Sequence, residues 1–365
     1  MKILITSPII PPEIGGPATY VSQLAGSLAR KHGVTIITFT KSPISISGVN
    51  IVSIPQFNFP LGSFFRQVSL LLQLAKHLPQ SDLVYCQGPI VVGVATTLVA
   101  KLFHKPLLLK FVGDIPWETA QLNHHTNKSL EGFYRSPLTS KYSILNRFQE
   151  SSLHLADIVI TPSNYLKTFL TKHHGLKPNK ITVISNAISV NSNTVSKLSN
   201  QLIYVGRLVP WKNVDQIIEA VSIARRQKPW KLLIVGIGPD KPKLLETTKK
   251  HQASSWVEFA GVLSKPKTQE QIARSQGLIL YSLYEGQPHV IIEALTLGTK
   301  VIVSDIKPNR EILRQNGQYA PLHSPNALAT QIKLLDNHPP ARSLKLFSWA
   351  DHLAHLEKLF LSAKK

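Results

Sequence analysis

Two carboxylates in the C-terminal half stand on either side of an expected helix N-terminus. They belong to the segment Tyr284-Glu285-Gly286-Gln287-Pro288-His289-Val290, which continues through Glu293 to Gly298. Pro288 suits the first turn of a helix, so Glu285 lies on the preceding loop and Glu293 one to two turns inside the helix. Backbone N–H groups at such a terminus can hold a phosphate, while the acids can accept hydrogen bonds from sugar hydroxyls. The alternative interpretation is structural: Glu285 is an acid that the helix dipole favours near the N-terminus, and Glu293 is an exposed helix residue.

A second group of residues combines a glycine with two cations. Gly206 and Arg207 follow the apolar run 202–205, and Lys212 comes five residues after Arg207, before the next helix pattern. Glycine lets the backbone approach a ligand, and Arg and Lys can neutralise a diphosphate, Arg through its planar fork and Lys as a point charge. In so basic a chain, a solvated surface loop is the alternative interpretation.

A third group is a glycine turn. Gly236 and Gly238 follow the apolar run 231–235. The third glycine of the dinucleotide-binding fingerprint is missing, so the turn favours close backbone approach to a ligand more than it favours an NAD site.

These groups follow strands in an alternating β/α pattern. In the first half, apolar runs at 2–6, 34–39, 83–86, 107–111 and 158–160 alternate with segments of helical spacing, among them 20–30, 65–78, 91–103 and 145–156. After the polar stretch 189–200 the pattern restarts, and it continues to 304. Such alternation predicts two parallel sheets covered by helices, with the second domain starting near residue 190. Open parallel sheets bind ligands at the carboxyl ends of their strands, and two such edges facing each other form a cleft.

Composition supports a two-domain globular chain. The 365 residues exceed one ordinary core, and 43% hydrophobic with 17% charged residues allows substantial burial. The single cysteine, Cys86, lies in an apolar run, which indicates a buried thiol and a reducing compartment. The longest apolar run, 89–100, is too short to span a bilayer, and the N-terminus lacks a leader pattern, so we expect a cytoplasmic protein.

The net charge of +21 attracts anions of many kinds, and the cations are spread over both halves. Nucleic-acid binding would favour clustered cations with interleaved aromatic residues, which the sequence lacks. The segment 64–76 is apolar around much of its circumference and has basic ends. It predicts either a helix that covers a sheet or a contact with an anionic membrane surface.

The ordered motifs resemble the retaining glycosyltransferases of family 4 (glycosyl transferases group 1), which have the GT-B fold. The resemblance rests on Gly206-Arg207 with Lys212, Gly236-Ile237-Gly238-Pro239, Phe259-Ala260-Gly261-Val262, and Glu285 through Glu293 to Gly298. Weaker support comes from Gly15-Gly16, Thr161-Pro162-Ser163, Ile184-Ser185-Asn186 and Phe347-Ser348-Trp349. The resemblance implies two Rossmann-like domains facing a central cleft: residues 1–188 on the acceptor side, 189–345 on the donor side, and 346–365 as a helix crossing back to the first domain.

The resemblance also implies site roles. Arg207 and Lys212 would bind the donor diphosphate, Glu285 would contact the transferred sugar, and Glu293 would hold the ribose. Backbone around Gly261–Leu263, which includes Val262, would meet the base, and Gly15-Gly16 would approach the donor phosphates from the other domain. The expected donor-binding residues are Gly15, Gly16, Gly206, Gly236, Val262, Gly286, Gln287, Pro288, His289, Val290 and Glu293. The expected donor is a UDP-sugar or GDP-mannose, the acceptor a hydroxyl of a glycan or lipid-linked precursor, and the expected reaction retains the anomeric configuration without a metal or other cofactor.

The first domain departs from the family pattern. Many members carry a histidine after the strand that corresponds to 107–111, whereas this chain has Gly113-Asp114. Asp114 is therefore a candidate to replace that histidine or to orient the acceptor, with a turn-forming Gly-Asp as the alternative. The 14 histidines form no metal-ligand spacing, and His173-His174 suits a helix C-terminus.

Other functions remain open at this point. An NDP-sugar epimerase or a phosphorylase could use the same fold, and a non-catalytic basic protein could bind anions. Turnover of donor without acceptor, dependence on phosphate, or binding without turnover would distinguish these three from a transferase.

Overall fold

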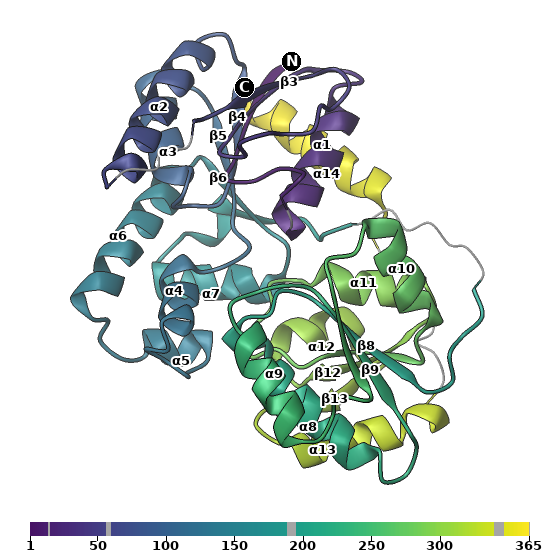
Figure 1. Ribbon diagram of the computed structural model, residues 1–365. Coiled ribbons are helices and arrows are strands. Elements are labelled where there is room, and N and C mark those ends of the chain that lie inside the picture. The colour runs from purple at the N-terminus through teal and green to yellow at the C-terminus, as the bar shows by residue number, and fades with distance from the viewer. Residues whose placement is uncertain (14, 56–59, 188–194, 339–346, 365) are drawn as a thin grey trace. The chain divides into compact units, whose positions relative to one another are not determined.

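The chain folds into two α/β units, each built on one parallel sheet (Figure 1). The computed structural model describes residues 1–13, 15–55, 60–187, 195–338 and 347–364. The first unit comprises 1–120, 130–185 and 350–365, and the second comprises 121–129 and 186–349. The predicted domain boundaries at 188/189 and 345/346 lie outside the described residues.

The first unit contains a seven-stranded sheet with the order β3-β2-β1-β4-β5-β6-β7. Its strands are β1 (Lys2–Ser7), β2 (Gly33–Thr38), β3 (Val49–Ser53), β4 (Leu83–Gln87), β5 (Leu107–Lys110), β6 (Ile158–Thr161) and β7 (Ile181–Val183). Every pairing is parallel. The central strands are almost wholly buried, as near-continuous apolar runs require when helices cover both faces.

Helices cover both faces of this sheet. The helices in this part of the chain are α1 (Gly16–Leu28), α2 (Gly62–His77), α3 (Gly93–Leu102), α4 (Ile115–Leu122), α5 (Leu130–Tyr134), α6 (Ser140–Leu155), α7 (Asn164–His174) and α14 (Trp349–Ala363), with a short 3-10 turn η1 (Pro178–Lys180) before β7. Figure 1 shows α2, α3 and α6 on one side of the sheet and α1 with α14 on the other. The expected helix over 64–76 is present as part of α2.

The terminal helix α14 packs on the first unit, as the family resemblance implied. Its His352 is buried between the Tyr20 hydroxyl, 2.9 Å from Nε2, and the Ser185 carbonyl, 2.7 Å from Nδ1. Phe360, also buried, meets the ring of Tyr85 at 5.6 Å between centroids. The last helix thereby completes the core under α1 and β4.

The second unit contains a six-stranded sheet with the order β10-β9-β8-β11-β12-β13. The strands are β8 (Gln201–Val205), β9 (Lys231–Val235), β10 (Val257–Gly261), β11 (Gly277–Leu280), β12 (Lys300–Ser304) and β13 (Gln318–Ala320). The helices are α8 (Val214–Ala224), α9 (Lys241–Lys250), α10 (Lys265–Arg274), α11 (His289–Thr296), α12 (Lys307–Leu313) and α13 (Pro325–Lys333), with 3-10 turns η2 (Pro210–Lys212) and η3 (Leu335–Asn337). One continuous apolar core joins the sheet to its helices.

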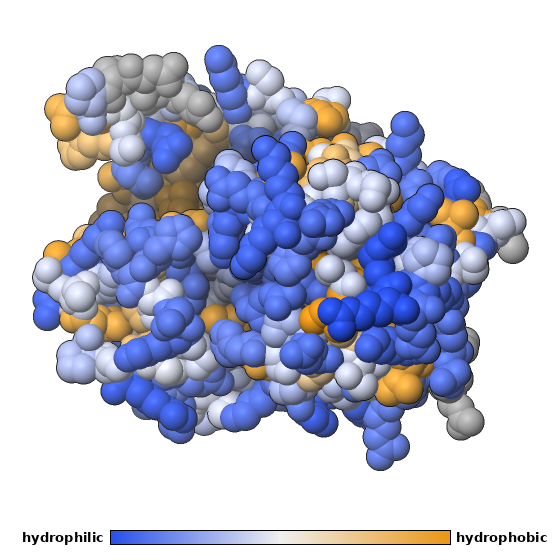
Figure 2. Space-filling view, turned by 60° about the horizontal axis from the view of Figure 1, so that its bottom comes forward, coloured by the Kyte–Doolittle hydropathy of each residue, from blue (hydrophilic) through white to orange (hydrophobic). Residues whose placement is uncertain are grey.

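The surface is mainly polar. Hydrophilic residues cover most of the face in Figure 2, and apolar residues lie among them in separate patches.

Cys86 is buried, and burial raises the pKa of its thiol to about 11, which agrees with the expected structural role. Among the described residues, none of the helices is both long and apolar enough to cross a membrane.

Candidate functional site

Four strand ends of the second unit bring the predicted motifs to one edge. Val205 at the end of β8 pairs with Val235 of β9, and Val235 pairs with Gly261 of β10. β11 lies on the other side of β8. Because all these strands are parallel, the loops that follow them leave from the same carboxyl edge, where ligands bind in open α/β sheets.

The two glycine loops at this edge touch each other. A Cβ on Gly236 would lie 1.9 Å from the Gly206 carbonyl oxygen, and a Cβ on Gly238 would lie 2.1 Å from that of Leu208. Gly236 also has a φ of 142°, which side chains rarely adopt. The Leu208 amide donates to the Ile237 carbonyl at 2.9 Å. Loop packing alone therefore requires glycine at both positions.

Lys212 and Glu285, predicted from separate motifs, are in direct contact. The Nζ atom of Lys212 lies 2.5 Å from Oε1 of Glu285, and both side chains are nearly buried, with exposed fractions of 13% and 8%. Lys212 ends η2 after β8, and Glu285 follows β11. The Leu283 amide donates to the Trp211 carbonyl at 2.7 Å, so a backbone bond holds the two loops together beside the ion pair.

Arg207 lies on the same loop as Lys212 and is exposed. Its guanidinium carbon is 5.4 Å from the ring centroid of Trp211, which is buried below it. The hydroxyl of Tyr204 donates to the Arg207 carbonyl at 2.8 Å and fixes the backbone of the loop. A planar cation held over an indole ring is well placed to receive an anion from solvent.

The helix N-terminus predicted after Glu285 is present. α11 begins at His289, with Pro288 as the preceding residue in an extended conformation. Asn186 binds this turn through two hydrogen bonds: its amide N–H donates to the Gln287 side chain at 2.5 Å and its Nδ2 donates to the Gln287 carbonyl at 2.9 Å. The sequence placed both residues in motifs, but it gave no indication that they bind each other.

Glu293 lies inside α11 and is half-buried. Burial raises its pKa, while the charge of Lys265 and a hydrogen bond from Gln269 act in the opposite direction. Both neighbours belong to α10, which packs on α11. They were not among the predicted site residues, because only the helix packing brings them to Glu293.

The other predicted donor-binding residues differ in exposure. Val262 follows β10 and is 44% exposed. Gly286 and His289 are half-buried at the start of α11, and Val290 packs on the core of the unit. In the first unit, Gly15 precedes α1 and Gly16 is its first residue. The two glycines thus form the junction between the loop that follows β1 and helix α1.

Asp114 is fully buried in the first unit, and its carboxylate is hydrogen-bonded by several other residues of that unit. Its carboxylate accepts hydrogen bonds from the Trp117 amide at 2.9 Å, the Tyr134 hydroxyl at 2.9 Å and Gln149 Nε2 at 2.6 Å. His174 Nε2 lies 3.5 Å away. These donors come from α4, α5, α6 and α7, so the carboxylate connects four helices. A direct role toward the acceptor stays a prediction.

His174 is held between two carboxylates. Its Nδ1 lies 3.3 Å from Glu150 Oε1, and Asp114 faces the other ring nitrogen. Burial disfavours the charged ring, but the two carboxylates outweigh burial and raise the pKa of His174. The hydrogen bond with His174 lowers the pKa of Glu150 in return. His174 therefore completes a buried charged cluster as well as ending α7.

Among the described residues, no three His, Cys, Asp or Glu side chains are grouped so that they could hold a metal ion. The charged groups at the carboxyl edge of the second unit include the predicted Arg207, Lys212 and Glu285, and Glu293 lies inside the helix that starts there.

Two protein-family models together match almost the whole chain. The family model described as glycosyl transferases group 1 matches residues 187–344, and the model for glycosyltransferase family 4 matches residues 14–192. The chain belongs to glycosyltransferase family 4. The resemblance inferred from the ordered glycine, cation and glutamate motifs is thus confirmed.

A curated relative of this family-4 glycosyltransferase is the amylovoran biosynthesis glycosyltransferase AmsD of Erwinia amylovora. The two are 31% identical over 191 residues, which cover 50% of this chain and 53% of the relative. The match therefore spans about half of each protein.

Solved structures agree in fold over the full length. Sucrose-phosphate synthase from Thermosynechococcus elongatus has a TM-score of 0.77 at 18% identity, covering 99% of this chain and 98% of that one. Anabaena HepE in complex with UDP-glucose has a TM-score of 0.71 at 17% identity, covering 100% and 97%. At such identities the likeness concerns the fold, and it confirms the GT-B architecture.

Proposed function

We propose that this family-4 glycosyltransferase moves a hexosyl group from a nucleotide-diphosphate donor, a UDP-sugar or GDP-mannose, to a hydroxyl of a glycan or lipid-linked acceptor. The observation that carries the proposal is the contact between Lys212 and Glu285 at the carboxyl edge of the second sheet. A cation for the diphosphate and an acid for the sugar hydroxyls stand side by side there, next to the N-terminus of α11.

The proposed donor site distributes the nucleotide sugar over these groups. Arg207 and Lys212 neutralise the diphosphate, and the amide groups at the start of α11 add partial positive charge. Glu285 accepts hydrogen bonds from the transferred sugar. Glu293 accepts them from the ribose, and backbone near Val262 meets the base. The bound UDP-glucose of HepE, a protein of the same fold, supports a nucleotide-sugar donor.

The proposed reaction retains the anomeric configuration. The acceptor hydroxyl oxygen forms a bond to the anomeric carbon on the face from which the diphosphate leaves, and the bond between that carbon and the diphosphate oxygen breaks. The hydroxyl proton passes to the departing phosphate oxygen. Charge accumulates on the leaving nucleoside diphosphate, where Arg207, Lys212 and the helix N-terminus stabilise it. We propose that these groups do so without a divalent metal.

A donor screen and a product analysis test this function. UDP, GDP and their sugar conjugates are added to the purified chain, and the unfolding temperature is recorded, since a ligand that binds the folded state stabilises it. One nucleotide series should raise the unfolding temperature, and transfer should persist in EDTA. NMR of the product should show the anomeric configuration of the donor. An inverted product, or loss of transfer in EDTA, would contradict the mechanism.

The same assay separates the alternative functions. Donor turnover without acceptor would indicate an epimerase, and turnover only with inorganic phosphate would indicate a phosphorylase. Nucleotide binding without turnover would indicate an anion-binding protein. We also propose a cytoplasmic location, in keeping with the reduced, buried Cys86 and with a nucleotide-sugar donor.

A further inference from the structure

Three neighbouring helices of the first unit form one layer over the seven-stranded sheet. α2 packs on α3, and α3 packs on α6 (Figure 1). Their inner sides meet the sheet through buried residues such as Leu74, Val99 and Leu153. A helix covering a sheet normally presents polar residues on its outer side. The outer sides of these three helices do not follow that pattern, and we call them together the outer helical face.

The outer side of α2 exposes four large apolar residues. Phe64 is 62% exposed and Leu72 is 66% exposed, with Phe65 and Leu71 also exposed between them. Phe64 and Leu71 are seven residues apart, as are Phe65 and Leu72, so each couple lies two turns apart on one side of the helix. They form two exposed apolar pairs on that side.

The two neighbouring helices also expose apolar residues. On α3, Leu98 is 55% exposed and Leu102 is 72% exposed, one turn apart. On α6, Ile144 and Phe148 are about half exposed and also one turn apart. Single exposed apolar residues are ordinary, but exposed apolar pairs on three packed helices mark an interaction surface.

The charges on these helices are almost all positive. The exposed cations of α2, α3 and α6 are Lys76, Lys101, Lys141 and Arg147, while Arg66 is half-buried with its guanidinium carbon 4.5 Å from the ring centroid of Phe39. Glu150 is the one acid in the three helices, and it is engaged by His174 and Asn146. An apolar face with a basic border complements an anionic lipid surface, because apolar side chains enter the interface while cations meet the phosphates.

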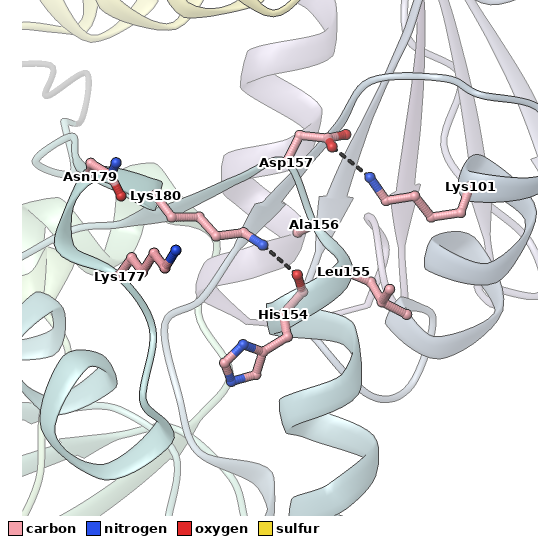
Figure 3. A pocket seen from close by; sticks show the side chains of 8 residues that line it. All are labelled: Lys101, His154, Leu155, Ala156, Asp157, Lys177, Asn179 and Lys180. Carbon is pink, nitrogen blue, oxygen red and sulfur yellow. Dashed lines mark hydrogen bonds and ion pairs between the residues drawn. The ribbon is translucent and has the colours of Figure 1, made fainter.

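A basic hollow lies where α3 and α6 end (Figure 3). Its volume is about 490 Å³, and Lys101, Lys177 and Lys180 line it. Lys101 binds Asp157 at 2.5 Å, and Lys180 donates to the His154 carbonyl. Three lysines and one carboxylate thus line the hollow. Burial, together with the charge of Lys101, lowers the pKa of Lys180, while Asp157 acts in the opposite direction. A phosphate would relieve the repulsion between Lys101 and Lys180.

We propose that the outer helical face docks on a membrane rich in anionic phospholipid. The leucine and phenylalanine side chains of α2, α3 and α6 enter the interface, and Lys101, Lys177 and Lys180 bind headgroup phosphates. A second copy of the chain is a poorer occupant, because two faces of the same positive charge repel each other. The proposal adds a location to the proposed function, and it does not depend on which sugar is transferred.

Vesicle sedimentation tests the docking. The purified full chain is mixed with sucrose-loaded vesicles of phosphatidylcholine alone, or with about one third phosphatidylglycerol, at low and physiological salt. We expect binding to the anionic vesicles only, weaker at higher salt. The variant Leu72→Ser/Leu102→Ser should lower the partition coefficient at least about tenfold. The matched control Leu361→Ser/Leu245→Ser changes two exposed leucines elsewhere and should leave it within about twofold.

The basic hollow has its own test. Lys177→Gln/Lys180→Gln should lower partition to the anionic vesicles about tenfold and leave the weak background on phosphatidylcholine unchanged. Unfolding temperature and stabilisation by the bound nucleotide, measured on every variant, show that the fold and the donor site are intact. Failure of nucleotide binding would contradict the proposed function and not the docking.

Three results would overturn the docking proposal. One is the absence of binding to anionic vesicles, and another is equal binding by the test and control leucine variants. The third is a wild-type dimer in light scattering that the Leu72→Ser/Leu102→Ser variant abolishes, since this would assign the face to a second copy of the chain.

Discussion

The ammonium nitrogen of Lys212 lies 2.5 Å from Glu285 Oε1, although 73 residues separate the two in the chain. The contact arises because β8 and β11 are neighbours in the sheet, so the loops that follow them meet at one edge. Removing either partner leaves the other charge nearly buried and unpaired. Removing one partner of this pair should therefore destabilise the second unit, and both groups stay charged at the edge where a ligand would bind.

Replacing Lys212 should abolish most of the transfer activity. Lys212→Ala removes a cation placed to stabilise the leaving diphosphate, and losing one such group costs about 10²–10³-fold in rate. We expect kcat/KM to fall by at least about 100-fold, measured with the donor found in the thermal screen.

The control for this prediction is Lys228→Ala. Lys228 also forms an ion pair, at 2.7 Å with Asp336, but it precedes β9 and so lies at the opposite edge of the sheet. Its loss should change kcat/KM by less than about threefold, as expected for a partly exposed pair. Equal activity of the Lys212 variant and wild type would refute the site assignment.

Gly238→Ala should lower the stability of the second unit. The new Cβ would lie 2.1 Å from the Leu208 carbonyl oxygen, so the two loops must separate. Forcing extra atoms into a packed contact costs about 1–3 kcal/mol, which calorimetry detects as a lower unfolding temperature. Gly33→Ala, whose Cβ would sit at an ordinary 3.7 Å from Lys2 Cγ, is the matched control. A variant as stable as that control would disprove the packing argument.

Acid should weaken the first unit through His352. Burial, followed by the charge of Lys110, lowers the pKa of His352 to about 4. In the unfolded chain a histidine titrates near pH 6.5, so between about pH 6.5 and 4 the unfolded state binds more protons. The free energy of unfolding should fall as the pH drops through this window, by up to about 1.4 kcal/mol per pH unit from this one group.

Denaturant titrations at several pH values check this. His352→Gln should lose this fall in unfolding free energy across the window, so that its curve is flatter than that of wild type, whereas His355→Gln, on the exposed side of the same helix, should preserve the slope. Parallel curves for wild type and His352→Gln would rule out the assignment.

Asp114→Asn should destabilise the first unit, and more so at low pH. The variant removes a carboxylate that helps to raise the pKa of His174. Because this pKa is raised, the stabilisation is fully present below about pH 6.5 and is lost as the pH rises through the folded value. We expect a larger loss of unfolding free energy at pH 6 than at pH 9. A fall in kcat with unchanged stability would instead favour the acceptor role predicted from the sequence.

The sequence predicted the two sheets because their strands are short apolar runs and their helices have apolar residues at helical spacing. It also placed Arg207, Lys212 and Glu285 at strand ends, since each motif follows such a run. The contacts between motifs were not predictable. Asn186 meets Gln287, and Lys265 and Gln269 meet Glu293, only because the sheet order and helix packing bring distant segments together. His174 was interpreted from its helix end alone, whereas Asp114 and Glu150 define its charge.

Helix α14 makes the first unit discontinuous along the chain, since residues 350–365 return to it after the whole of the second unit. During synthesis on the ribosome, the contacts of His352 and Phe360 with Tyr20 and Tyr85 cannot form until residues 350–365 have been translated. A nascent chain that has already built its second unit therefore still carries an unfinished first one, and a fragment ending near residue 188 lacks the part that closes its own core.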